Sequence, residues 1–139
     1  MTNEDVLLVQ QSWTKVLPLH ATAAALFYRK LFALDPGMRP LFTGDMDQQG
    51  TKLLQMITAA VRGLDRLDAL LPVVRDLGMR HETYGVRDEH YGTVATALLW
   101  TLEQALREEF TPEVKSAWIK TYGVLSQTMR GAQMPPRAA

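Results

Sequence analysis

The chain has 139 residues, of which 47% are hydrophobic and 22% charged, a composition that excludes an intrinsically disordered protein and suffices for one domain with a buried core. Lys and Arg together number 15, as do Asp and Glu, so the formal net charge is zero and no general attraction to nucleic acid or to an anionic membrane is expected. The chain contains no cysteine, which excludes disulfides, thiolate metal sites and cysteine nucleophiles.

Six substantial helices are predicted, because apolar residues recur at three- and four-residue intervals through most of the chain. The first helix follows a capping box of Thr2 and Asp5 and ends before Pro18. The second runs over residues 21–34 and stops at the Asp-Pro-Gly sequence of residues 35–37. No segment alternates polar and apolar residues in the manner of a strand, so the fold class is predicted to be all-α.

The third helix follows a short turn or helix that carries Leu41 and Phe42. Either Asp45 or Asp47 can cap this third helix, and its apolar face ends near Arg62. The predicted helices are unequal in length and show no heptad repeat, which favours packing at steep crossing angles over a coiled-coil bundle.

The fourth predicted helix places one histidine on its apolar face. We expect Asp68 to cap this helix. Val74 and Leu77 mark the apolar face, and His81 follows on it four residues after Leu77, in the last turn of the helix. A lone inward histidine is more often a hydrogen-bonded core residue than a metal ligand, so spacing alone does not assign its role.

The last two helices have recognisable start signals. Asp88 is predicted to cap a long fifth helix that contains Tyr91. Thr111 is predicted to cap the sixth helix, with a proline at its first helical position. Residues 1–133 are therefore assigned to one domain, and residues 134–139 are expected to form a disordered tail.

Several kinds of site lack the residues that they need. The chain has neither a Gly-x-x-x-x-Gly-Lys-Ser/Thr loop nor a Gly-x-Gly-x-x-Gly motif, so nucleotide hydrolysis and dinucleotide binding are not expected. The three histidines, His20, His81 and His90, form no helical pair, so a multi-histidine metal site lacks its ligands. A single imidazole suffices where the metal arrives with most of its coordination filled, as iron does in haem.

A haem held by His81 on one face needs a pocket on its other face, and the chain offers residues for one. Gln49 and Leu53 lie four residues apart on the third helix and supply a polar and an apolar side chain. Tyr28 is predicted on the buried side of the second helix, from which it can reach the same pocket. The aromatic ring of Phe42 can stack on the porphyrin.

These residues follow one another in the order that the globin family shows, and the chain resembles bacterial single-domain haemoglobins and the globin domain of flavohaemoglobins in particular. The resemblance covers residues 4–130. It rests on Trp13, Tyr28, Leu31, Phe32, Asp35, Pro36, Leu41, Phe42, Gln49, Leu53, His81, Tyr91, Tyr122, Gly123 and Val124. The resemblance implies a globin fold around non-covalently bound haem b, with six main helices packed about the haem pocket.

The resemblance implies that His81 is the metal ligand on the proximal side of the haem. Val86 would pack against the haem beyond His81, and Arg80 would meet a haem propionate, although a solvated surface arginine is the simpler interpretation. Tyr91 is similar to a cofactor-side tyrosine that, in flavohaemoglobins, links the proximal histidine to a carboxylate. The carboxylate position falls near Gln133, which is uncharged, so strong peroxidase-like activation of oxygen is not expected.

The resemblance implies that Tyr28 and Gln49 form the distal pair that hydrogen-bonds dioxygen. Leu53 would shape the distal site and Phe42 would wedge the haem in place. Phe42 and Leu53 would serve equally as core residues, since a globin core is largely built on haem. Tyr28 and Gln49 differ: unless they are an ordinary interface tyrosine and a surface amide, two inward polar side chains without a ligand are costly to bury.

The predicted function is reversible binding of dioxygen for transport, storage or delivery, with carbon monoxide and nitric oxide as further gaseous ligands. One alternative is a nitric oxide dioxygenase that forms nitrate with an external reductase, and another is a haem-free interaction module with the globin fold. The polar, acidic N-terminus and the lack of a long uncharged stretch favour a cytoplasmic protein without a membrane segment. The resemblance implies a bacterial source. We expect a monomer or a weak homodimer.

Overall fold

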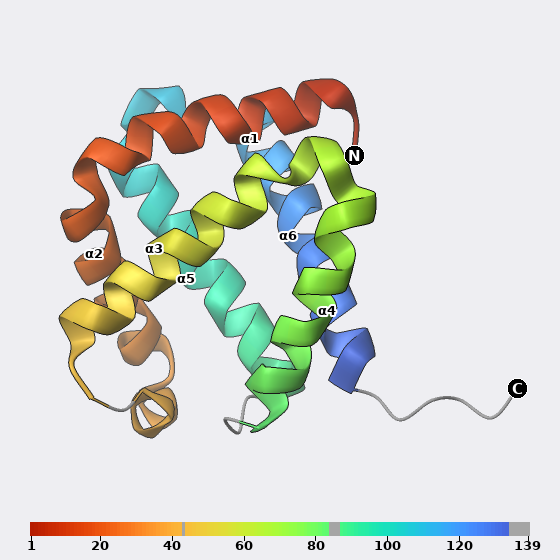
Figure 1. The fold of residues 1–139 in the computed structure, drawn as a ribbon. Helices are drawn as coiled ribbons and strands as arrows, with labels where there is room; N and C mark the ends of the chain where they lie inside the picture. The colour runs from red at the N-terminus through yellow and green to blue at the C-terminus, as the bar shows by residue number, and fades with distance from the viewer. Residues whose placement is uncertain (43, 84–86, 134–139) are drawn as a thin grey trace, which may run out of the picture.

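The computed structural model describes residues 1–42, 44–83 and 87–133, with side chains for all of them except residues 81–83 and 132–133. These residues form α-helices and short 3-10 helices without a strand, so the all-α prediction is confirmed for the described part of the chain. The elements in chain order (Figure 1) are α1 (Asn3–Val16), η1 (Leu17–Leu19), α2 (His20–Leu34), η2 (Pro36–Leu41), α3 (Met46–Arg62), η3 (Leu64–Arg66), α4 (Leu67–Thr83), α5 (Asp88–Leu106), η4 (Arg107–Glu109) and α6 (Pro112–Gln133). The tail predicted for residues 134–139 lies outside the described residues.

Three helix starts have the caps that the sequence predicts. At α1, the Asp5 N–H donates to Thr2 Oγ1 over 3.1 Å and the Thr2 N–H donates to Asp5 Oδ2 over 2.9 Å. At α3, the cap is Asp45, whose carboxylate accepts a hydrogen bond from the Asp47 N–H at 2.9 Å. At α6, the Val114 N–H donates to Thr111 Oγ1 over 3.2 Å. These caps satisfy amide groups that the first turn of a helix leaves without a backbone partner.

Two other predicted starts are wrong, the one at Asp68 by two residues and the one at Asp88 by one. Asp68 does not cap α4, because η3 runs directly into α4 at Leu67. Asp88 is the first residue of α5, and the cap position belongs to Arg87, whose N–H donates to His90 Nδ1 over 2.9 Å. In both places the preceding backbone decides where the helix begins, and the spacing of apolar residues does not report on that backbone.

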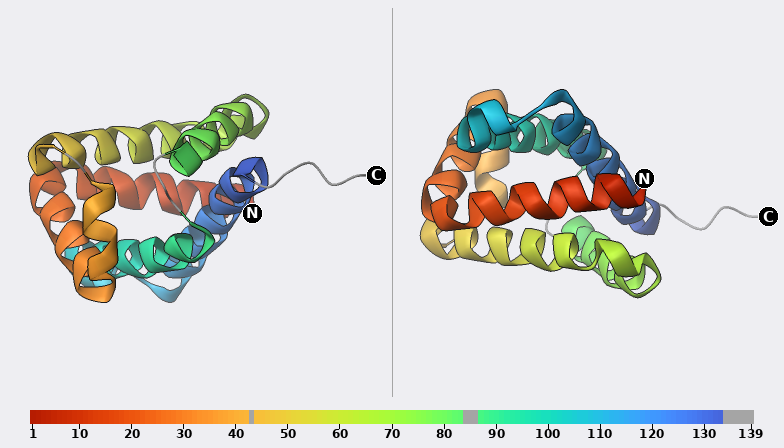
Figure 2. Two further views of the ribbon diagram at one scale, coloured as in Figure 1. Left: turned by 90° about the horizontal axis from the view of Figure 1, so that it is seen from below. Right: turned by 90° about the horizontal axis from the view of Figure 1, so that it is seen from above.

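The helices cross one another and do not run as a parallel bundle. Figure 2 shows α3 and α4 on one side of the molecule, α5 and α6 on the other, and α2 with η2 at one end. In Figure 1, α1 runs across α5 and α6. The most extensive helix contacts are those of α4 with α6, α2 with α5 and α1 with α6. This is the crossed packing that the unequal, non-heptad helices predict.

Helices α4 and α6 approach each other most closely at Gly78. A Cβ atom added to this buried glycine would lie 2.5 Å from the carbonyl oxygen of Met129 and 2.6 Å from its Cα. Only a residue without a side chain fits where two backbones come this close. Gly78 therefore sets the position of the C-terminal half of α4, the half that carries His81 in its last turn.

Apolar side chains gather in two clusters. The larger, the tryptophan core, has the buried members Val9, Trp13, Val16, Ala23, Leu54, Val61, Leu64, Leu102, Leu106, Val114, Ala117 and Trp118. The smaller, the Tyr28 cluster, has the buried members Phe27, Tyr28, Leu31, Met38 and Ala97. The tryptophan core joins α1, α2, α3, η3, α5 and α6, whereas the Tyr28 cluster lies where α2 meets η2 and α5.

Candidate functional site

The Tyr28 cluster brings together three of the predicted pocket residues. Phe42, which follows η2, and Leu53, on α3, both pack against the buried members of this cluster, which include Tyr28. Three elements that are separate in the sequence thus contribute to one apolar, aromatic surface. These are three of the residues that the sequence assigns to the predicted pocket.

Three aromatic rings pack around Tyr28. Its ring centroid lies 5.3 Å from that of Phe27, 5.9 Å from that of Phe32 and 5.3 Å from that of Phe42, with the Phe32 ring stacked and the other two edge-on. Such offset and edge-to-face pairs fix the orientation of a ring. The phenol of Tyr28 is therefore preorganised and cannot rotate freely to find a partner.

The hydroxyl group of Tyr28 has no partner within the described part of the chain. The residue is only 7% exposed, yet no described residue hydrogen-bonds its hydroxyl. Among the described side chains, no completely enclosed polar atom lacks a partner, so this hydroxyl must retain access to open space. Burial raises its pKa to about 12, which keeps the phenol neutral and able to donate a hydrogen bond at neutral pH.

Helix α3 lies against α2 because Gly50 allows a close approach. A Cβ atom added to Gly50 would lie 3.1 Å from the Cβ of Ala24 and 3.8 Å from Cε2 of Tyr28. Gly50 is buried, and its neighbour Gln49 is half-buried in the first turn of α3. The backbone beside Gln49 therefore lies close to the phenol of Tyr28. Sequence analysis missed Gly50, although a glycine inside a helical pattern is a signal of close packing.

The predicted proximal residues are placed only in part. His81 lies in the last turn of α4, which ends at Thr83, as the sequence predicts; its side chain is outside the description. Val86 lies outside the described residues. Arg80 is exposed, and Tyr91 is buried in the first turn of α5. The functional roles assigned to these residues stay predictions.

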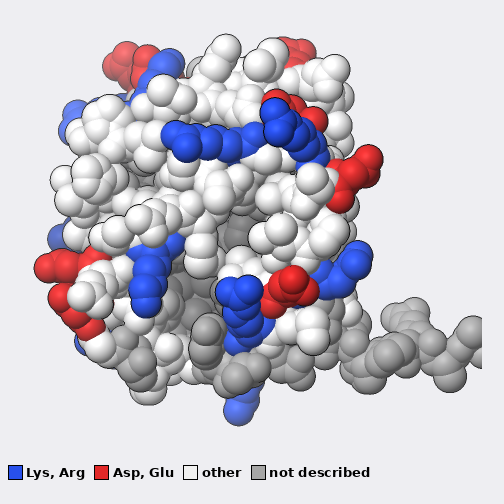
Figure 3. Space-filling view, in the orientation of Figure 1, with Lys and Arg blue, Asp and Glu red and all other residues white. Residues whose placement is uncertain are grey.

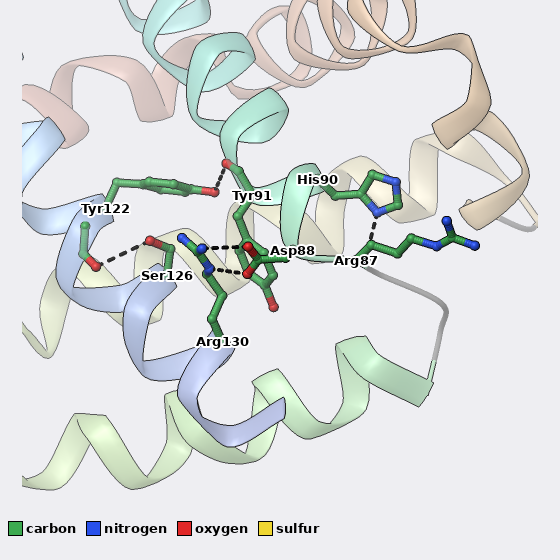
Figure 4. Close-up of polar contacts among 8 residues, drawn as sticks. Arg87, Asp88, His90, Tyr91, Tyr122, Ser126 and Arg130 are labelled. Carbon is green, nitrogen blue, oxygen red and sulfur yellow. Dashed lines mark hydrogen bonds and ion pairs between the residues drawn. The ribbon is translucent and has the colours of Figure 1, made fainter. Parts of the chain in front are cut away.

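Tyr91 is contacted by two residues of α6 that sequence analysis did not single out for a role near the cofactor (Figure 4). The hydroxyl of Tyr122 donates to the carbonyl oxygen of Tyr91 over 2.6 Å. The guanidinium of Arg130 lies 6.0 Å from the centroid of the Tyr91 ring and is paired with Asp88. Burial raises the pKa of Tyr122, so this phenol also stays a neutral donor.

The outer surface around α3 and α4 mixes charges of both signs. Figure 3 shows basic and acidic side chains interspersed on this face, with a hollow near its middle. The described residues contain no helix long and apolar enough to cross a membrane. They also bring no three His, Asp or Glu side chains together in a metal-binding group.

A sequence profile of the globin family, described as Globin, matches residues 25–129. The chain belongs to the globin family. This globin is 29% identical over 137 residues to the flavohemoprotein of Bacillus subtilis (strain 168), an alignment that covers 96% of the chain and 34% of that protein. It is 31% identical over 143 residues to the flavohemoprotein of Bordetella parapertussis, with 100% of the chain and 36% of that protein covered. The chain thus spans about a third of the length of these relatives.

The fold of this globin is also that of solved structures. It superposes with a TM-score of 0.85 and 18% identity on the crystal structure of a hexacoordinated heme protein from an anhydrobiotic tardigrade at pH 4, covering 95% of this chain and 94% of the other. The globin fold and the family resemblance that the sequence predicts are therefore confirmed.

Proposed function

We propose that this globin holds haem b non-covalently against the Tyr28 cluster and binds dioxygen reversibly. The observation that carries the proposal is the Tyr28 hydroxyl, which has no partner among the described residues although the residue is largely buried, and which keeps access to open space. A donor in that position is available to a ligand that enters beside the cluster. An apolar, aromatic surface with one such donor fits a flat hydrophobic cofactor whose small ligand needs a polar contact.

Haem, when bound, supplies an iron that takes diatomic gases such as dioxygen, carbon monoxide and nitric oxide. On the Tyr28 side, Phe42 and Leu53 would pack against the porphyrin. Tyr28 and Gln49 would each donate a hydrogen bond to the gas. Such donors favour dioxygen, which gains negative charge on binding, over carbon monoxide, which gains little.

On the opposite side, His81 would ligate the iron from the last turn of α4. The exposed Arg80 would meet a haem propionate, and Val86 would cover the porphyrin beyond His81. Buried Tyr91 would lie on the same side as His81, and the second ring nitrogen of the imidazole would donate a hydrogen bond to a backbone carbonyl, for which Leu77 is the candidate. These four roles follow from the family resemblance together with the positions of His81, Arg80 and Tyr91 on α4 and α5.

The decisive experiment measures dioxygen release from the haem-loaded protein. Each distal hydrogen bond contributes about 1.5 kcal/mol, so Tyr28→Phe and Gln49→Leu should each raise the dioxygen off-rate about tenfold, and the double variant about a hundredfold. Carbon monoxide release should change far less. Gln55→Leu, an exposed glutamine on the same helix, is the matched control and should leave both rates unchanged. Off-rates within twofold of wild type in both distal variants would refute the distal assignment.

Haem binding itself is tested by the visible spectrum of the purified protein after haem supplementation. We expect a Soret band in the wild type and its loss or a changed ferrous spectrum in His81→Ala. A wild type without a Soret band would support the alternative of a haem-free interaction module. If His81→Ala binds haem as tightly as the wild type and its ferrous spectrum is unchanged, His81 is excluded as the iron ligand.

A second candidate function is nitric oxide dioxygenation, favoured by the similarity to two flavohemoproteins over nearly the whole chain. Nitric oxide and dioxygen form nitrate with uptake of one electron, so repeated turnover needs a reductase. We expect dioxygen binding without sustained nitric oxide consumption when a flavin reductase and NADH are supplied. Continuous consumption under those conditions would favour the enzyme, whereas a single stoichiometric burst would favour storage or delivery.

A further inference from the structure

We propose that a cavity between α5 and α6 binds a small, uncharged aromatic molecule. The cavity has a volume of about 240 Å³. Its walls include Ala95 and Leu98 of α5 and Trp118, Ile119, Tyr122 and Gly123 of α6. None of these residues belongs to the proposed haem site, so the proposal does not require that the protein binds haem.

Space for the cavity remains because α5 and α6 pack more extensively against other helices than against each other. Both helices lie on the same side of the molecule (Figure 2). The contact between them is less extensive than those of α5 with α2 and of α6 with α1 and α4. Trp118, which is 3% exposed, lines the interior of the cavity, whereas Ile119, which is 49% exposed, lines it at the surface. A molecule can therefore enter the cavity from solvent beside Ile119.

The polar groups of the two aromatic walls already have partners in the protein. The indole N–H of Trp118 donates to Ser12 Oγ over 2.8 Å, and the hydroxyl of Tyr122 donates to the carbonyl oxygen of Tyr91 over 2.6 Å. The second of these bonds is drawn in Figure 4. The other residues that line the cavity have alkyl side chains or, at Gly123, none. A charged ligand would lose its hydration there without gaining a partner, so only an uncharged one fits.

The size of the cavity and its aromatic walls indicate the class of ligand. An apolar protein cavity of about 150 Å³ takes up benzene, so about 240 Å³ accommodates a substituted ring or two fused rings. The rings of Trp118 and Tyr122 can pack edge-to-face or offset against a bound ring, which contributes binding energy beyond the burial of apolar area. Water is a poor occupant of such a space, because a buried water needs about two to four polar partners.

Gly123 keeps the cavity open on the side of α6. A Cβ atom added to this glycine would meet no atom of another helix within 4 Å, in contrast to Gly78, where the Met129 backbone excludes a side chain. Glycine inside a helix is less favourable than alanine, and no close backbone approach requires it here. Because Gly123 lines the cavity, its missing side chain leaves room for a ligand. It belongs to the Tyr-Gly-Val sequence of residues 122–124, to which the proposed function assigns no role.

The test measures binding of toluene to the full chain by isothermal titration calorimetry. Haem is supplied first, so that the proposed haem site is not available to the probe. We expect toluene to bind at one site per chain. Benzoate carries a charged group on the same ring and should bind at least about tenfold more weakly, because the cavity offers its carboxylate no partner.

Two variants fill the cavity from opposite walls. The benzyl group of phenylalanine has the size of toluene, so Gly123→Phe on α6 and Ala95→Phe on α5 each place a competing ring in the space. Each variant should weaken toluene binding at least about tenfold. The matched control is Gly131→Phe, because Gly131 is an exposed glycine of the same helix that also has open space around it but does not line the cavity. Its affinity for toluene should equal that of the wild type.

Each outcome bears on the proposal. Weaker binding in Gly123→Phe and Ala95→Phe, with wild-type binding in Gly131→Phe, supports it. Equal binding in all three variants, or no binding to the wild type, overturns it. If Gly123→Phe does not fold, Ala95→Phe decides alone.

Two other occupants of the space are separated by the same measurements. If a second copy of the chain covers the cavity, sedimentation shows a dimer of the wild type that takes up no toluene, which overturns the proposal. If toluene binds only before haem is supplied, it occupies the haem site, which overturns the proposal as well. A wild type that takes up no haem would refute the proposed function, but the effects of Gly123→Phe and Ala95→Phe would still decide whether toluene binds between α5 and α6.

Discussion

The tryptophan core and the Tyr28 cluster differ in whether their side-chain hydrogen-bond donors have partners within the protein. In the tryptophan core the indole of Trp13 donates to Thr58 Oγ1 over 3.0 Å, and the indole of Trp118 donates to Ser12 Oγ over 2.8 Å. In the Tyr28 cluster the hydroxyl of Tyr28 has no partner among the described residues. A core that serves only folding satisfies its buried donors internally. The Tyr28 hydroxyl instead keeps access to open space, which is why the proposed ligand site lies beside it.

The largest effect is expected from breaking the tryptophan core. Trp118 is 3% exposed and packs edge-on against Trp13, with ring centroids 5.9 Å apart. Trp118→Ala should lower the free energy of unfolding by about 3–5 kcal/mol, measured by urea denaturation. Trp100, a half-buried indole covered by Lys30, is the control, and its replacement by Ala should cost clearly less. Equal losses would mean that the tryptophan core is not the main source of stability.

The next largest loss of stability is expected from disrupting the contact between α4 and α6. This contact positions the half of α4 that carries His81. Gly78→Ala forces a Cβ atom against the Met129 backbone, so we expect a loss of about 1–3 kcal/mol in unfolding free energy. Gly92 is a helical glycine of α5 with open space where a Cβ would lie. Gly92→Ala should therefore stabilise the protein, by up to about 1 kcal/mol. If Gly78→Ala and Gly92→Ala both raised or both lowered the free energy of unfolding, the close backbone contact at Gly78 would not be the cause of the loss.

A smaller effect sharpens the comparison of the two clusters directly. Ser12→Ala leaves the Trp118 indole N–H without its acceptor and should cost about 1–2 kcal/mol in the haem-free protein. Tyr28→Phe removes a hydroxyl that leaves no described residue unpaired, so stability should be unchanged or slightly higher. Urea denaturation of both variants measures the difference. A marked loss in Tyr28→Phe would mean that its hydroxyl serves the fold.

The smallest effect concerns alkaline pH. Burial raises the pKa of Tyr28 from 10.0 to about 12, and it raises the pKa of Tyr122 as well. Below pH 10 both phenols are protonated in the folded and the unfolded chain. As the pH rises from 10 to 12 the unfolded chain loses protons that the folded chain keeps, so stability falls. The fall in the urea midpoint over this range should be shallower in Tyr28→Phe, and an identical fall would contradict burial of the Tyr28 phenol.

Much of the fold was predictable because its signals are local. The capping box of Thr2 and Asp5 and the three- and four-residue apolar spacing act within one helical turn, and both appear in the structure. The position of His81 in the last turn of its helix follows from the same spacing. The starts at Asp68 and Asp88 were misassigned because they depend on the backbone that precedes each helix.

The sequence by itself determined the helices, the globin family and the chemical types available to a pocket, because these depend on residue identity and on neighbours within a turn. Only the tertiary structure decided which backbones touch at Gly78 and Met129, and which charge lies over the Tyr91 ring. Arg130 and Asp88 are 42 positions apart, and their pairing depends on how α5 and α6 cross. Periodicity records which face of a helix is buried, but it carries no information on which other helix buries it.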